Sequence, residues 1–351
     1  MANMDVGVPK FFTDSINFLM SVGTAQNGNF DVVTGDTSTN LISTYVTGSE
    51  AELFDLKPMN QVTFNTTAST QVRGDHVLIN INKQSTNFKT DYIAILNHNM
   101  NSAEAKVRVA FADALDDIND VDLANADNVM ANASEVVNAD AISSNIVTPA
   151  ANGSTIFTFD ETDEQFIGIQ FEGSGGSNLF NASNNLKIGS IMVGEHYTMP
   201  HSPDVTLKRS IIYDGVNVQQ SMGGAKYANA SHIGRKYVNT LNKSPFLTTT
   251  YPSGVYGGRI SYDLNFSFLA SSDVMPTSYG VEVENSDTVV ADVWNRTKGN
   301  LFPFIFCSDS SLTGNKAEQN YIFARFAQNS LDMQQVAPSV FNIGMRIEEE
   351  F

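Results

Sequence analysis

The sequence predicts an all-β protein, with an antiparallel β-sandwich followed by a second β-rich domain that holds one short helix. Three observations support this prediction. Apolar and polar residues alternate along many short segments, clusters of Asn, Gly, Ser and Asp separate those segments, and helical periodicity is scarce. Such turn clusters reverse the chain without a crossover helix, so the strands are expected to pair antiparallel.

The strongest alternation covers residues 260–268. One face would carry Ile260, Tyr262, Leu264, Phe266 and Phe268, and the other Ser261, Asp263, Asn265 and Ser267. This pattern is typical of a half-buried strand, because successive side chains point to opposite faces of a sheet. Shorter alternating runs predict further strands at 77–81, 107–111, 166–171 and 341–347.

Two segments have a helical pattern. In 287–298, Ser286 or Asp287 can cap the start, Val289, Val290, Val293 and Trp294 form an apolar stripe, and Lys298-Gly299 provides a basic end and a stop. Residues 14–22 form a weaker candidate.

Composition divides the chain into three parts. Residues 1–30 are expected to form an N-terminal arm, residues 31–200 the β-sandwich domain, and residues 201–351 the second β-domain, with the boundary at the Pro200-His-Ser-Pro203 turn. The stretch at about 113–152, rich in Ala, Asn and Asp with little periodicity, is predicted to be an acidic insertion in the first domain.

Charge and cysteine content exclude several classes of function. The net charge of −18 argues against nucleic-acid binding, which needs clustered Lys and Arg facing the phosphates. The single cysteine, Cys307, cannot form an internal disulfide. The apolar run at 18–25 is too short to span a bilayer and lacks a basic start, so neither membrane insertion nor an export signal is expected.

No residues form a recognisable catalytic, cofactor or metal site. Five aspartates lie within ten residues, at 113, 116, 117, 120 and 122, but their spacing does not fit a calcium-binding loop. The five histidines lack zinc-site spacing, and no GxSxG sequence is present. Acid pairs for glycoside hydrolysis cannot be nominated from sequence, so the chain is expected not to be an enzyme.

One local stretch, 226–243, is basic and aromatic, with Lys226, Arg235 and Lys236 among glycines. Paired with the acidic Asp116, Asp117 and Asp120, it suggests electrostatic matching between subunits, which would set their register in a ring. The alternative at this stage is an ordinary solvated loop.

Three parts of the sequence resemble virion proteins of marine tailed phages. They are the start, Val8-Pro-Lys-Phe-Phe-Thr-Asp-Ser-Ile-Asn17; the segment Asp91-Tyr-Ile-Ala-Ile-Leu-Asn-His-Asn99; and a C-terminal set that comprises Met199-Pro-His-Ser-Pro-Asp204, the strand at 260–268, Leu301-Phe-Pro-Phe-Ile-Phe306 and Tyr321-Ile-Phe-Ala-Arg-Phe326. The resemblance implies a tail protein near the tip or baseplate, with a jelly-roll or galactose-binding-like first domain. It implies no catalytic residues, and the acidic insertion has no counterpart in it.

These observations lead to one expectation and one rival. The expectation is a virion protein, assembled in the host cytoplasm, that forms a homo-oligomeric ring in the phage tail (tail tip, distal tail or baseplate) and contacts other tail proteins. The rival is a module that binds host-surface glycan through aromatic loop residues, with Tyr251, Tyr256 and Trp294 as candidates, although Trp294 is expected to face the core.

Overall fold

A computed structural model describes residues 7–22, 28–33, 41–67, 75–84, 88–118, 129–143, 145–176, 179–212, 216–230, 259–277, 287–314 and 317–350. Within them the chain is built mostly of antiparallel strands with a few short helices, which confirms the predicted all-β class. The strands form sheets of eleven, six, three and two strands.

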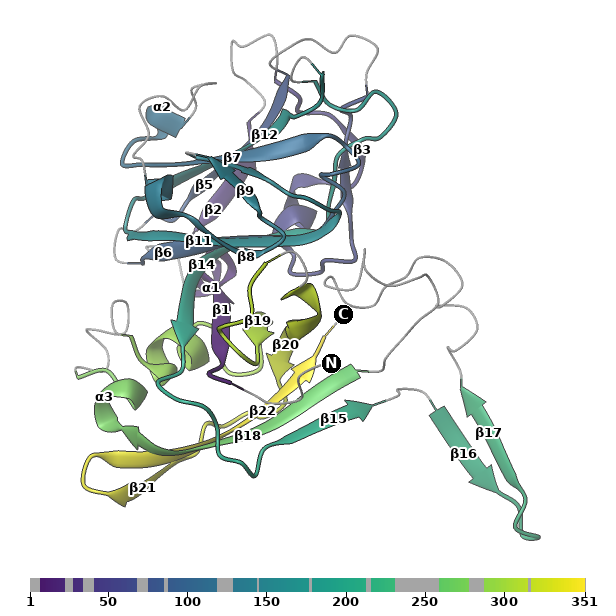
Figure 1. The fold of residues 1–351 in the computed structure, drawn as a ribbon, viewed down its shortest axis with the longest axis vertical. Helices are drawn as coiled ribbons and strands as arrows, with labels where there is room; N and C mark the ends of the chain where they lie inside the picture. Colours follow the sequence, from purple (N-terminus) through teal and green to yellow (C-terminus); the bar gives the residue numbers. More distant parts are fainter. Residues whose placement is uncertain are drawn as a thin grey trace.

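The largest sheet runs through the whole molecule (Figure 1). Its path, in order across the sheet, is β15 (Lys208–Ile212), β18 (Arg259–Ala270), β22 (Val340–Glu349), β20 (Tyr321–Phe326), β19 (Phe304–Cys307), β1 (Lys10–Asp14), β14 (Ser190–Thr198), β6 (Thr90–His98), β11 (Gly153–Thr162) and β8 (Ser134–Val137). An eleventh strand, β21 (Met333–Ala337), pairs with β22. Strands from both sides of residue 200 therefore belong to one sheet.

The six-stranded sheet packs on one end of the large sheet to make a sandwich. Its order is β2 (Asn29–Val32), β5 (His76–Asn82), β12 (Phe166–Gly173), β7 (Ala105–Ala112), β10 (Ile146–Thr148) and β9 (Ala141–Ser143). The two sheets share one apolar core, because Ile79, Val109 and Ile169 of the smaller sheet pack in the same cluster as Ile93 and Phe157 of the larger. This shared core is what a sandwich requires.

The remaining elements are small. They are the three-stranded sheet of β13 (Lys187–Ile188), β4 (Val62–Phe64) and β3 (Tyr45–Thr47); the hairpin of β16 (Val216–Gln220) and β17 (Lys226–Ala230); the helices α1 (Ser15–Val22), α2 (Leu115–Ile118) and α3 (Ser271–Val274); the 3-10 turns η1 (Glu50–Phe54), η2 (Val129–Asn132) and η5 (Ala317–Asn320); and a π-type helix, η4 (Val289–Asn295). The sequence prediction of strands at 77–81, 107–111, 166–171, 260–268 and 341–347 is confirmed by β5, β7, β12, β18 and β22.

Both helical predictions are also confirmed, by α1 and η4. The cap of η4 differs from the predicted Ser286 or Asp287, because Thr288 accepts a hydrogen bond from the Ala291 amide, 3.2 Å away. The helix ends at Asn295, earlier than the predicted Lys298, and Lys298 and Gly299 follow it with both φ angles in the left-handed region.

Strand β1 lies inside the segment that the sequence suggests is an N-terminal arm. It pairs on one side with β14, from Lys10 opposite Thr198 to Asp14 opposite Gly194, and on the other side with β19. Its two adjacent phenylalanines point to opposite faces of the sheet and enter different cores. Phe11 packs in the C-terminal cluster, and Phe12 packs in a cluster that includes Tyr92 of the sandwich. Strand β1 thus joins the first and last parts of the chain.

Candidate functional site

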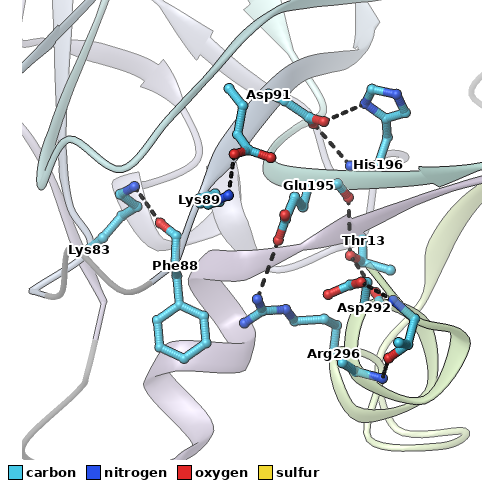
Figure 2. Close-up of polar contacts among 12 residues, drawn as sticks. Thr13, Lys83, Phe88, Lys89, Asp91, Glu195, His196, Asp292 and Arg296 are labelled. Carbon is cyan, nitrogen blue, oxygen red and sulfur yellow. Dashed lines mark hydrogen bonds and ion pairs between the residues drawn. The ribbon is translucent and has the colours of Figure 1, made fainter. Parts of the chain in front are cut away.

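Two features of the described residues are candidates for function. The first is a largely buried set of ionisable side chains where β1, β6, β14 and η4 meet, which we call the polar junction: Asp14, Lys83, Asp91, Glu195, His196, Asp292 and Arg296 (Figure 2 labels all of them except Asp14). The second is an exposed arm, made of residues 205–212 and the β16–β17 hairpin; Figure 1 shows the hairpin projecting from the body, whereas β15 lies along β18 at the edge of the large sheet.

Arg296 lies at the centre of the polar junction. It follows the last turn of η4 and is only 1% exposed. Its guanidinium carbon lies 5.1 Å from the ring centroid of Phe18 and 4.3 Å from that of Phe88, and its Nη2 lies 3.4 Å from Glu195 Oε2. Two aromatic faces and one carboxylate therefore compensate a cation that has been removed from water.

Burial raises the pKa of three carboxyl groups in the junction. Desolvation raises the pKa of Glu195 to about 8 and that of Asp292 to about 7, although the nearby Arg296 opposes both shifts. Desolvation also raises the pKa of Asp14 to about 6, against hydrogen bonds from Asn17. The charged form is disfavoured in each case because the apolar surroundings replace water.

Further contacts extend the junction into the sandwich. The backbone amide of His196 donates to Asp91 Oδ1 at 2.9 Å, and His196 Nδ1 lies 2.7 Å from Asp91 Oδ2. Lys83 is fully buried and donates through Nζ to the Phe88 carbonyl at 2.6 Å (Figure 2). Burial lowers the pKa of Lys83 to about 8.

Hydrogen bonds to the backbone tie the junction together. Thr13 Oγ1 lies 3.2 Å from the Glu195 carbonyl and 3.1 Å from the Asp292 carbonyl, and the Tyr92 hydroxyl donates to the Thr13 carbonyl at 2.8 Å. The four carboxylates, Asp14, Asp91, Glu195 and Asp292, are each less than a tenth exposed. A catalytic acid must lie within hydrogen-bond reach of the proton that it transfers, so a substrate could reach these carboxyl groups only if the polar junction opened. The arrangement is suited to fixing strands and helix to each other.

The hairpin of the exposed arm is regularly built. Val218 pairs opposite Ala228 and Gln219 opposite Tyr227, so Val216, Val218 and Ala228 share one face. At its tip the Ser221 amide donates to the Ala225 carbonyl at 2.8 Å and the Gly224 amide to the Ser221 carbonyl at 2.9 Å. Gly224 has a φ of +85°, which the turn requires and which glycine adopts without strain.

The exposed arm is unusually apolar for a surface. Seven of the fifteen large hydrophobic side chains that are exposed among the described residues belong to it: Val205, Ile211, Ile212, Val216, Val218, Met222 and Tyr227. Val218 is 56% exposed and Tyr227 66%. Of these, Val216 and Val218 share one face of the hairpin. Exposed apolar patches mark interaction surfaces more often than isolated apolar residues do.

The structure describes some of the residues that the sequence nominated for subunit contact or glycan binding. Lys226 lies exposed in β17, and Asp116 lies exposed in α2, which also contains Asp117. Within one chain, β17 and α2 lie at opposite ends of the molecule (Figure 1). Arg235, Lys236, Asp120, Tyr251 and Tyr256 lie outside the described residues.

Trp294 is half-buried in η4 and packs against the C-terminal core, with its ring centroid 5.1 Å from that of Phe326. The expectation that this residue faces the core is confirmed.

Sequence reasoning missed the polar junction, although one signal was present. Ile191, Val193, Glu195 and Tyr197 alternate along β14, so an acid occupies an apolar face of a strand. An ionisable residue at such a position is almost never buried without a partner. Arg296 gave no comparable signal, since it follows a helix as many solvated arginines do.

Within the described parts of the chain, no group of three or more His, Cys, Asp or Glu side chains is arranged to hold a metal ion. In the same parts, every helix is too short or too polar to cross a membrane.

Comparison with known proteins gives few relatives. No family model matches the chain, and no curated protein matches it. Among solved structures it is similar to CpGH89CBM32-6, produced by Clostridium perfringens, with 14% identity over 50% of this chain and 98% of the other, at a TM-score of 0.21. It is also similar to a DUF4466 family protein from Parabacteroides merdae, with 10% identity over 93% and 99% of the two chains, at a TM-score of 0.12. Scores this low carry no argument about function.

Proposed function

We propose that this protein is a non-enzymatic structural subunit of a phage tail, in the tail tip, distal tail or baseplate, which acts by symmetric assembly with its own copies and with other tail proteins. The observation that carries the proposal is the exposed arm. Its hairpin is fully formed, yet every residue of β16 is exposed, as are Lys226 and Tyr227 of β17.

A hairpin of this kind gains little stability by itself. Two strands without a third strand or a covering layer are at best marginally stable in water. Unpaired edges with apolar side chains also invite pairing with other chains, so soluble monomers usually blunt or cover them. Val216 and Val218 instead leave one apolar face of the hairpin open, and Ile211 on the edge strand β15 is also exposed. A neighbouring subunit would cover it.

The rest of the fold suits a building block. The eleven-stranded sheet continues from the sandwich into the C-terminal part, and β1 lies between the two. The polar junction ties the same region together through contacts between Arg296, Glu195 and Thr13. A rigid body of this kind would transmit the position of one contact surface to another, which ring assembly requires. The resemblance to virion proteins supports a place in the tail.

The experiment that tests this proposal is to locate the protein in tailed-phage particles that encode it. Gold-labelled antibody against the chain, viewed by electron microscopy, should mark the tail. Label on the capsid, or none on the particle, would contradict the proposal. A glycan array with the purified protein separates the rival role: selective retention that is lost in Tyr251→Ala or Tyr256→Ala would favour glycan binding.

A further inference from the structure

Positive charge is concentrated in the stretch of sequence that contains the exposed arm. Residues 205–259 contain seven Lys or Arg and one acid, Asp214, which gives this stretch a net charge of +6. The chain as a whole has a charge of −18, so the remainder amounts to −24. A second copy of the same protein therefore offers surfaces of complementary charge. Such complementarity speeds the encounter of two subunits and fixes their relative orientation.

The most acidic stretch of that remainder is residues 113–128, which contain six aspartates and no base. Its described residues, 113–118, include α2, which packs on β7 and β12. There Asp113 and Asp116 are exposed, and between them Leu115 is 42% exposed. This acidic end therefore combines negative charge with an open apolar side chain, and the arm combines Val218 with Lys226 in the same way.

One copy of the protein cannot bring these two surfaces together. Strand β15 is hydrogen-bonded to β18 at the edge of the large sheet, whereas α2 rests on the far side of the six-stranded sheet. Figure 1 shows the hairpin and α2 at opposite ends of the molecule. Two different surfaces at opposite ends give a head-to-tail contact, which closes into a ring or continues as a filament.

We propose that the apolar, basic β16–β17 hairpin of one copy docks on the acidic end around α2 of a second copy, so that subunits join head to tail. This inference rests on the proposed assembly function and specifies its partner and its two surfaces. The contact would cover Val216 and Val218 on the arm and Leu115 on the acidic end, while Lys226 faces Asp113 and Asp116.

Sedimentation velocity of the full chain at low and high salt, over a range of concentrations, tests the inference with two variants. The arm variant is Val218→Asp with Lys226→Glu, and the end variant is Asp113→Lys with Asp116→Lys. All four side chains are exposed, so the fold should persist. We expect the wild type to associate at low salt and less at high salt, because ions screen the charges. Each variant alone should remain monomeric.

Mixing the two variants distinguishes head-to-tail from symmetric contact. Each variant retains one intact surface that matches the intact surface of the other, so an equimolar mixture should associate into species of two or more chains. If the mixture stays monomeric, the two surfaces do not bind each other and the inference is wrong. It is equally wrong if either variant associates as the wild type does.

Matched controls separate the specific contact from general charge effects. Val46→Asp with Lys57→Glu changes an exposed valine and an exposed lysine far along the chain from the arm. Asp287→Lys with Asp332→Lys repeats the charge reversal of the end variant at other exposed sites. Both controls should associate as the wild type does. A wild type that is monomeric at every concentration and salt would instead contradict self-assembly, and with it the proposed function.

Discussion

At the scale of single residues, Arg296 is the most informative side chain. It is 1% exposed, stacks on Phe18 and Phe88, and pairs with Glu195. Buried ion pairs are not reliable sources of stability in themselves, but the removal of one partner is costly because the other remains desolvated. Arg296 therefore matters for stability mainly because its removal would leave Glu195 buried without its partner.

We predict that Arg296→Met lowers the free energy of unfolding by about 3–5 kcal/mol, the range for breaking a buried pair. Chemical denaturation at about pH 9 measures this, because Glu195, with a pKa of about 8, is ionised there. The control is Arg325→Met, because Arg325 also pairs with an acid, Glu350 at 2.5 Å, but both side chains are about one third exposed. Its loss should cost no more than about 1 kcal/mol. Equal losses of unfolding free energy in the two variants would show that the buried pair of Arg296 contributes no more than an exposed one.

The sequence could indicate individual residues only where local pattern was enough. The half-buried place of Trp294 followed from the apolar stripe of its helix, and it packs on Phe326 as that stripe requires. The partners of Arg296 could not be predicted, because Glu195 is 101 residues away in the chain. Periodicity carries no information about which distant strand will meet a helix end.

At the scale of elements, the polar junction makes the contact between β14 and η4 sensitive to pH. Glu195, Asp292 and Asp14 have folded pKa values of about 8, 7 and 6, raised by desolvation from ordinary values of 4.5, 3.8 and 3.8. The folded chain thus holds these protons more tightly than the unfolded chain. The stability that they contribute is complete below about pH 4 and is lost as the pH rises through the folded values.

We predict that the free energy of unfolding falls by a few kcal/mol between about pH 4.5 and pH 8 on account of this junction. The charged groups that face it, Arg296, Lys83, Asp91 and Glu161, modulate the slope. Above pH 8, Lys83 makes the free energy of unfolding rise with pH, because burial lowers its pKa to about 8 and the folded chain there binds fewer protons than the unfolded chain.

Glu195→Gln removes the most strongly shifted of the three junction acids while keeping its shape. Denaturation across this pH range should show a shallower slope for Glu195→Gln than for the wild type, and an unchanged slope for the exposed control Asp160→Asn. A Glu195→Gln protein with the wild-type slope would contradict the assignment.

Elements with strong alternation could be predicted from sequence, and short ones with distant partners could not. Strand β18 follows the predicted alternation from Tyr262 to Phe266, where one face meets the core and the other solvent. The prediction was wrong for Phe268, because a register shift after Phe266 leaves Phe268 76% exposed and buries Leu269 instead. Strand β1 has five residues, nearly all buried, and it pairs with strands roughly 180 and 295 positions away. A short, fully buried strand has no alternation to detect.

Strand β1 should stabilise both parts of the molecule at once. Phe12 is fully buried and lies 5.0 Å from the Tyr92 ring and 6.2 Å from the Tyr321 ring, between centroids. We predict that Phe12→Ala costs about 3–5 kcal/mol, as large-to-small changes in cores do. Phe268→Ala, at a phenylalanine that is 76% exposed, should cost less than about 1 kcal/mol in the same denaturation experiment. Similar costs for the two would contradict the central place of β1.

At the scale of the whole molecule, one sheet should make the chain unfold as a unit. The only tryptophan, Trp294, reports on the C-terminal core, whereas far-ultraviolet circular dichroism reports on every strand. We predict that the two signals change at the same denaturant concentration, and that Phe12→Ala shifts both by the same amount. Separate transitions would show that the sandwich and the C-terminal part fold independently.

The all-β class was predictable at this scale because turn residues and alternation recur along the chain. The continuity of the large sheet was not predictable, since it depends on pairings such as β1 with β19 that bridge nearly the full sequence. That the hairpin projects into solvent could not be predicted for a different reason. Its alternation of Val216, Asn217 and Val218 resembles that of a half-buried strand. Only the structure shows that nothing described within the chain covers it.

The central claim is that the exposed arm is completed by another subunit. Cryo-electron microscopy of the purified full-length protein at low salt tests it most directly. We predict closed rings or filaments in which the β16–β17 hairpin is covered by a neighbouring copy, with Val218 out of contact with solvent. Particles that assemble through other surfaces and leave the hairpin free, or single chains alone, would contradict it.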